Sequence, residues 1–170
     1  MLNFLFRRLT DERHEGAALF DSLTGEARNP HWYVEGQVPD TIDGRFAVLA
    51  TVIALALVRL ERIGDEGNQL SVALTERFIA VMESEHRELG LGDPTLGKKV
   101  RKLVASLARR VELWRTSMTS NGNWVDAVRQ SVYKDAVAPD ALHHSSAELR
   151  RYSARLDRTD LNALGEGRLN

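Results

Sequence analysis

Residues 38–62 read VPDTIDGRFAVLATVIALALVRLER and decide the fold. Between Phe46 and Val58, the only polar side chain is that of Thr51. A helix that is apolar on every side must be surrounded by other helices or by lipid. Crossing a bilayer takes about 20 apolar residues, so the run 46–58 is too short to span one. The sequence therefore predicts a helix buried at the centre of a helical domain.

Polar residues in front of this run predict where the central helix begins. Asp40 or Thr41 can cap it, because their side-chain oxygens can accept hydrogen bonds from N–H groups in the first turn. Gly44 lies in that first turn, where a glycine lowers helix stability. We therefore expect another stretch of backbone to approach closely at Gly44.

Periodic apolar residues and turn signals predict the rest of the fold. The prediction is an all-α single domain of about six or seven helices around the buried central helix, because no strand-like alternation or repeat is present. We expect a short amphipathic segment at 1–10 that docks on the core or contacts lipid. Helices are predicted in a domain spanning 11–158, and one more turn with a frayed tail at 159–170. Besides the central helix, the predicted helices are 11–28, 71–88 with Ser71 as N-cap, 95–118, 124–137 and 139–158.

The overall composition excludes several classes of function. The chain has 170 residues, 23 basic against 24 acidic side chains and no cysteine. Its net charge of -1 gives no general field toward nucleic acid or anionic lipid, and no specific DNA binding is predicted. Disulfides, thiolate metal sites and cysteine nucleophiles are excluded. The opening residues lack the pattern of a signal peptide, so we expect a cytoplasmic location.

Neither catalysis nor a cofactor is predicted. None of the five histidines pairs with another at i,i+4, and no serine lies in a nucleophile elbow, so we predict no catalytic residue and no metal site. The segment GDPTLGKK at 92–99 resembles a phosphate-binding loop, but Lys99 replaces the Ser or Thr that binds the metal ion. A predicted helix precedes the segment where the motif needs a strand. We expect a helix start there, with Gly97 closely packed.

Two surface features have two interpretations each. Trp32 and Tyr33 lie in the irregular segment 31–40, where they either cover the core or contact a partner, as aromatic residues of binding hot spots do. Lys98, Lys102 and Arg109 share one face of the third predicted long helix, opposite its apolar stripe. That face is either simply solvated or docks on RNA, the ribosome or acidic lipid.

Three segments, in their order and spacing, resemble the ubiquinol–cytochrome c chaperone family. They are Trp32-Tyr33 followed by VPDTIDGRF (38–46), LALVRL (55–60) followed by the charged residues Glu61 and Arg62, and RELGLGD (87–93) followed by GKKV (97–100). The resemblance covers about residues 30–115. The chain length is similar to that of compact bacterial members.

The resemblance implies a non-enzymatic, all-helical factor that assists assembly of the respiratory cytochrome bc complex. Its expected partner is newly made cytochrome b or another subunit of that complex, with the ribosome or the cytoplasmic face of the inner membrane as a docking place. A homodimer stays open, and an RNA- or ribosome-binding module using the basic helix is the alternative function. The residues predicted to contact the partner are Trp32, Tyr33, Asp40, Arg45, Phe46, Gly92, Asp93, Gly97, Lys98 and Lys102.

Overall fold

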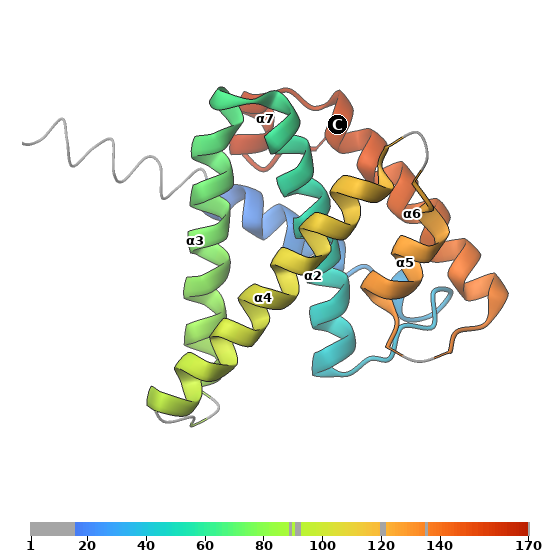
Figure 1. Cartoon of the computed structure of the whole chain (residues 1–170), viewed down its shortest axis with the longest axis horizontal. Helices are drawn as coiled ribbons and strands as arrows, with labels where there is room; N and C mark the ends of the chain where they lie inside the picture. The colour runs from blue at the N-terminus through green and yellow to red at the C-terminus, as the bar shows by residue number, and fades with distance from the viewer. Residues whose placement is uncertain (1–15, 89, 91–92, 120–121, 135, 170) are drawn as a thin grey trace, which may run out of the picture.

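A computed structural model describes residues 16–88, 90, 93–119, 122–134 and 136–169. All regular structure in this part of the chain is helical, which confirms the all-α prediction (Figure 1). The predicted segment 1–10 lies outside the described residues. Residues 16–27 are helical, and the elements that follow are η1 (Pro30–Trp32), α2 (Ile42–Ile63), α3 (Asp65–Glu88), α4 (Asp93–Ser117), α5 (Trp124–Val132), α6 (Pro139–Arg158) and α7 (Leu161–Gly165).

Helix α2 lies at the centre, as the apolar run predicts. It contacts α3, α4, α5 and α6, and every residue from Ala50 to Val58 is buried. In Figure 1, α4 crosses in front of α2 while α3 and α5 stand on either side of it. None of the helices in the described part of the chain has both the length and the apolarity that a membrane crossing requires.

The beginning of α2 also agrees with the sequence. The side chain of Thr41 caps the helix, because its Oγ1 accepts a hydrogen bond from the backbone N–H of Gly44 at 3.1 Å. A Cβ atom on Gly44 would lie only 1.9 Å from the carbonyl oxygen of Pro39. The predicted close approach of backbone at Gly44 is therefore confirmed.

Helix α3 begins six residues before the predicted start, at Asp65, so the assignment of Ser71 as N-cap is wrong. Gly64 alone breaks the chain between α2 and α3, because it adopts φ 90°, a conformation that favours glycine. Gly67 does not interrupt α3; a Cβ there would meet the carbonyl oxygen of Leu60 at 2.3 Å. This glycine permits the tight reversal between two long helices.

Two other helix ends differ from the prediction. Helix α4 begins at Asp93, so Gly97 is inside the helix. Among the described residues, a Cβ added at Gly97 would meet only the flexible side chain of Arg101, at 3.4 Å. The expected close packing at Gly97 is therefore wrong. Helix α5 ends at Val132 instead of 137, since Tyr133 leaves the helical conformation and its hydroxyl lies 2.6 Å from the carbonyl oxygen of Gly36.

The carboxyl-terminal residues pack against the core, in contrast to the expected frayed tail. Leu164 in α7 is 1% exposed, and Leu169 contacts the core cluster. Gly167, at φ 70°, brings the chain close to the backbone of the 16–27 helix, where an added Cβ would lie 2.4 Å from the carbonyl oxygen of Ala18. The two ends of the described chain therefore meet on one side of the domain.

Candidate partner-binding surface

The segment between residues 29 and 41 leads into α2 and is anchored by Trp32. The Trp32 side chain is 0% exposed, and its Nε1 donates a hydrogen bond to the carbonyl oxygen of Glu26 at 3.0 Å. Gly36 folds back onto the same turn, where an added Cβ would lie 2.5 Å from the carbonyl oxygen of Trp32. Of the two interpretations, Trp32 follows the first: it covers the core and has no surface left for a partner.

Tyr33, Asp40 and Arg45 form a cluster at the start of α2, in which Asp40 and Arg45 are exposed and Tyr33 is partly buried against the core. The Tyr33 hydroxyl donates a hydrogen bond to the carbonyl oxygen of Ala27 at 2.7 Å, and the Arg45 guanidinium lies 5.8 Å from the centre of the Tyr33 ring. Arg45 Nε also donates to Asp40 Oδ1 at 2.6 Å, and this bond holds the pKa of Asp40 below its usual value. Because Asp40 and Arg45 are both more than half exposed, their pairing adds little stability and leaves both accessible.

Phe46 points inward from the same end of α2. Its ring lies 6.3 Å from that of Phe78, and the Arg110 guanidinium lies 5.8 Å from its centre. Phe46 therefore lines a pocket instead of extending the cluster.

Two exposed apolar side chains near the cluster escaped the sequence analysis. Val34 is 67% exposed and Ile42 is 74% exposed, which are the highest values among large apolar residues in the described ranges. Val34 follows Tyr33 directly, and Ile42 is the first residue of α2. Val34 and Ile42 both lie outside the apolar run 46–58, so the sequence offered no sign that they would face solvent. Together with Tyr33, Asp40 and Arg45 they define what we call the α2 entrance surface.

The predicted contact residues on α4 form a separate group. Lys98 and Lys102 are exposed, and Gly97 is partly exposed on the same helix. Gly92 lies outside the described residues, and of Asp93 only the backbone is described. Figure 1 places this end of α4 beside the end of α3, away from the 29–41 segment. The predicted set therefore does not converge on one site.

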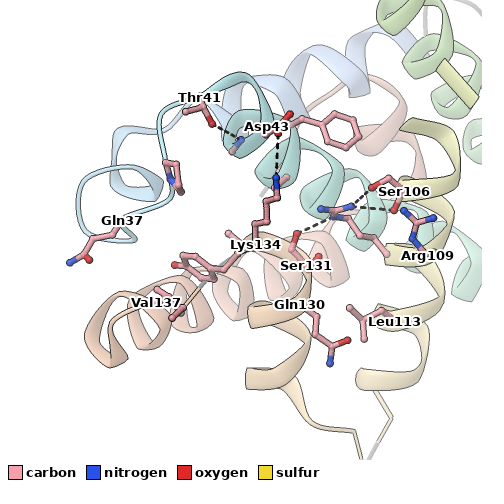
Figure 2. Close-up of a pocket in the computed structure, with 18 of the residues that line it drawn as sticks. Gln37, Thr41, Asp43, Ser106, Arg109, Leu113, Gln130, Ser131, Lys134 and Val137 are labelled. Carbon is pink, nitrogen blue, oxygen red and sulfur yellow. Dashed lines mark hydrogen bonds and ion pairs between the residues drawn. The ribbon is translucent and has the colours of Figure 1, made fainter. Parts of the chain in front are cut away.

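A pocket of about 940 Å³ opens beside the α2 entrance surface (Figure 2). Its walls come from the start of α2, the middle of α4, the end of α5 and the connection after it. Apolar side chains include Phe46, Leu113 and Val137, and the charged ones include Arg109 and Arg110. In Figure 2, Ser106 of α4 and Ser131 of α5 lie in the wall of the pocket.

Arg110 lies partly buried in the wall of this pocket. Its Nε donates to the carbonyl oxygen of Ser131 at 3.0 Å, and its Nη1 donates to Ser106 Oγ at 2.5 Å. Burial, together with the neighbouring charge of Arg109, lowers the pKa of Arg110 to about 10, so the side chain is still a cation at neutral pH. Sequence alone could not distinguish Arg110 from its exposed neighbour.

His31 and His144 also come together, although they are 113 positions apart. The Nδ1 atom of His31 lies 3.2 Å from Nε2 of His144, and Glu26 Oε1 lies 3.9 Å from Nε2 of His31. Burial lowers the pKa of His31, outweighing the opposite effects of Glu148 and Glu26. Within the described ranges, no group of three or more histidine, aspartate or glutamate side chains is placed to hold a metal ion.

Comparisons with known proteins point to one family. Residues 34–170 match the family model described as ubiquinol-cytochrome C chaperone. The fold is similar to the crystal structure of the Cbp3 homolog from Brucella abortus, with a TM-score of 0.77 and 26% sequence identity over 98% of this chain and 94% of that one. A comparison with curated protein sequences gave no match.

Proposed function

Because the chain belongs to the ubiquinol–cytochrome C chaperone family, we propose that it assists assembly of the respiratory cytochrome bc complex by engaging newly made cytochrome b. Family membership supports the assembly role and implies a non-enzymatic one. The observation that carries the proposal is the match over residues 34–170, which includes most of the α2 entrance surface.

The α2 entrance surface suits an apolar client segment with polar flanks. Val34 and Ile42 present apolar area to solvent, and Asp40 and Arg45 supply one charge of each sign from the same stretch of chain. Aromatic and arginine side chains are frequent among residues that dominate binding energy. A transmembrane segment emerging from the ribosome has the matching character, an apolar stretch bounded by polar residues.

In this proposal the exposed lysines of α4 have a different function from the α2 entrance surface. Lys98 and Lys102 lie away from the entrance surface, and no described carboxylate pairs with either. A cationic face of this kind increases association with anionic surfaces at low ionic strength. We assign it to peripheral docking on the cytoplasmic face of the inner membrane, near the site of synthesis.

Site-specific photocrosslinking tests the client assignment. A photoreactive phenylalanine analogue replaces Val34 or Ile42 in the full chain, and cytochrome b is then synthesised in its presence. Val72 and Val125, which are 50% and 41% exposed, provide matched controls on α3 and α5. We expect adducts with cytochrome b from positions 34 and 42 and none from 72 and 125. Equal adducts at all four positions, or none at 34 and 42, would reject the proposed surface.

Charge reversal separates the two predicted groups and tests the RNA-binding alternative. Arg45→Glu should reduce crosslinking of cytochrome b, whereas Lys98→Glu should reduce membrane association without changing the crosslink. Binding of the purified chain to RNA that falls steeply with salt and is lost in Lys98→Glu would favour the RNA-binding module instead, because phosphate contacts release counterions.

A further inference from the structure

Arg110 keeps a positive charge in a pocket wall without a counter-charge. Its Nε and Nη1 atoms bond to Ser131 and Ser106, but within the described ranges no hydrogen bond reaches Nη2 and no carboxylate pairs with the side chain. Removing a charge from water is unfavourable unless an opposite charge or several hydrogen bonds compensate it. Nε and Nη1 therefore have hydrogen-bond acceptors within the fold, whereas Nη2 is available to bind a ligand.

The two acidic side chains among the described residues that line the pocket each have a basic partner other than Arg110. Asp43 Oδ2 lies 4.0 Å from Nζ of Lys134, which also lines the pocket, and Figure 2 marks this contact. Glu112 forms an ion pair with Arg115 on the same helix. Neither carboxylate therefore neutralises Arg110.

Arg109 adds a second free cation to the same wall. It lines the pocket, is exposed, and has no ion pair with any described carboxylate. Its charge disfavours that of Arg110, which is a repulsion that an anion between them would relieve. Among the described side chains that line the pocket, the cations Arg109, Arg110 and Lys134 outnumber the anions Asp43 and Glu112. Their balance is positive although the whole chain has a net charge of -1.

We propose that this pocket binds a carboxylate of an acidic peptide segment, held by Arg109 and Arg110. The guanidinium fork of Arg109 matches the two oxygens of a carboxylate, and Nη2 of Arg110 can donate one further hydrogen bond. The walls contributed by Phe46, Leu113 and Val137 are apolar, which suits a side chain next to the carboxylate better than a free, fully hydrated phosphate. A volume of about 940 Å³ exceeds the needs of one carboxylate and accommodates several residues around it.

The inference goes beyond the proposed function. The pocket is distinct from Val34 and Ile42, and an acidic segment of any partner protein would satisfy it. Loss of the photocrosslink at positions 34 and 42 would therefore not affect this proposal, and failure of the pocket would not affect assembly through the entrance surface.

Fluorescence anisotropy with a labelled peptide tests the proposal. The probe is Ala-Leu-Glu-Leu-Glu-Ala with blocked ends, the control probe carries Gln in place of both Glu residues, and the full chain is titrated at low salt. We expect the Glu peptide to bind about tenfold more tightly than the Gln peptide. Arg109→Gln should remove most of that difference, whereas Arg101→Gln, an equal charge change on an exposed part of α4 outside the pocket, should preserve it.

Three outcomes would overturn the proposal. Equal affinity for both peptides would show that no carboxylate is recognised. If Arg109→Gln and Arg101→Gln lose equal affinity for the Glu peptide, the peptide is attracted only by the general charge of the basic helix. Binding of phosphatidylglycerol vesicles that depends on Arg109, with no binding of the Glu peptide, would assign the pocket to a lipid surface. Arg109 has no described hydrogen bond, so this test holds even if Arg110 variants fail to fold.

Discussion

Thr51 and Ser131 face each other in the core, with Oγ1 of one 2.7 Å from Oγ of the other. Thr51 is the single polar side chain in the apolar run of α2, and it also donates to the carbonyl oxygen of Ala47 at 2.7 Å. Trp114 Nε1 donates to the same Ser131 hydroxyl at 3.0 Å. Ser131 therefore joins α2, α4 and α5, and its carbonyl oxygen accepts from Arg110 in the pocket.

Ser131→Ala should destabilise the protein more than Thr51→Val. The alanine leaves the buried Trp114 N–H without its acceptor, which costs about 1–3 kcal/mol in the free energy of unfolding. Thr51→Val removes the contacts of the hydroxyl with Ala47 and Ser131 but leaves Trp114 bonded to Ser131, so we expect a cost of about 1 kcal/mol. Urea unfolding of both variants measures the difference. Equal costs would contradict the central role of Ser131.

Tyr152→Phe should leave stability unchanged or raise it by up to about 1 kcal/mol. The Tyr152 side chain is 1% exposed, and its hydroxyl has no hydrogen-bond partner in the described part of the chain. Burial raises the pKa of this phenol far above its usual value. Thermal unfolding checks the variant, with Tyr133→Phe as the control that should destabilise, because the Tyr133 hydroxyl lies 2.7 Å from Ser145 Oγ.

Gly44→Ala and Gly25→Ala should change stability in opposite directions. An alanine at position 44 would drive its Cβ into the carbonyl oxygen of Pro39, a clash that costs about 1–3 kcal/mol. Gly25 is helical and an added Cβ would meet no atom of the described residues within 4 Å, so alanine there should stabilise by about 0.5–1 kcal/mol. A stable Gly44→Ala protein would show that the start of α2 is packed differently.

His31 should make stability depend on pH on the acidic side of neutrality. Because burial lowers its pKa from 6.5, the unfolded chain takes up a proton there more readily than the folded protein. The contribution is intact above about pH 6.5 and is lost as the pH falls through the lower folded pKa. His31→Gln should therefore reduce the loss of unfolding free energy between about pH 7 and pH 5. If the unfolding free energy of His31→Gln depends on pH as steeply as that of the wild type, other groups cause the pH dependence.

The central features of the fold could be predicted because they are local. The run 46–58 has no polar face and is too short to cross a bilayer, so burial among other helices could be predicted. Thr41 and Gly44 indicate where α2 begins, Thr41 because its side chain can cap the helix and Gly44 because a glycine allows close approach of the backbone. Both signals depend on residues that are neighbours in the sequence.

The site was less predictable because tertiary contacts decide it. Arg109 and Arg110 are indistinguishable in sequence, yet only Arg110 meets the carbonyl oxygen of Ser131, which is 21 positions away. Helix α5 ends early because Tyr133 bonds to Gly36, which is 97 positions away. Partner contact by the predicted residues stays a prediction, and Trp32, being buried, serves the fold of the segment instead.

The most direct test of the assembly role is deletion of the gene in its own host, followed by a reduced-minus-oxidised spectrum of the membranes. The account predicts loss of the b-type haem signal of the cytochrome bc complex and of quinol oxidation, both restored by the wild-type gene. Restoration by Arg45→Glu should be weaker. An unchanged spectrum with normal quinol oxidation, in a host that respires through this complex, would contradict the account.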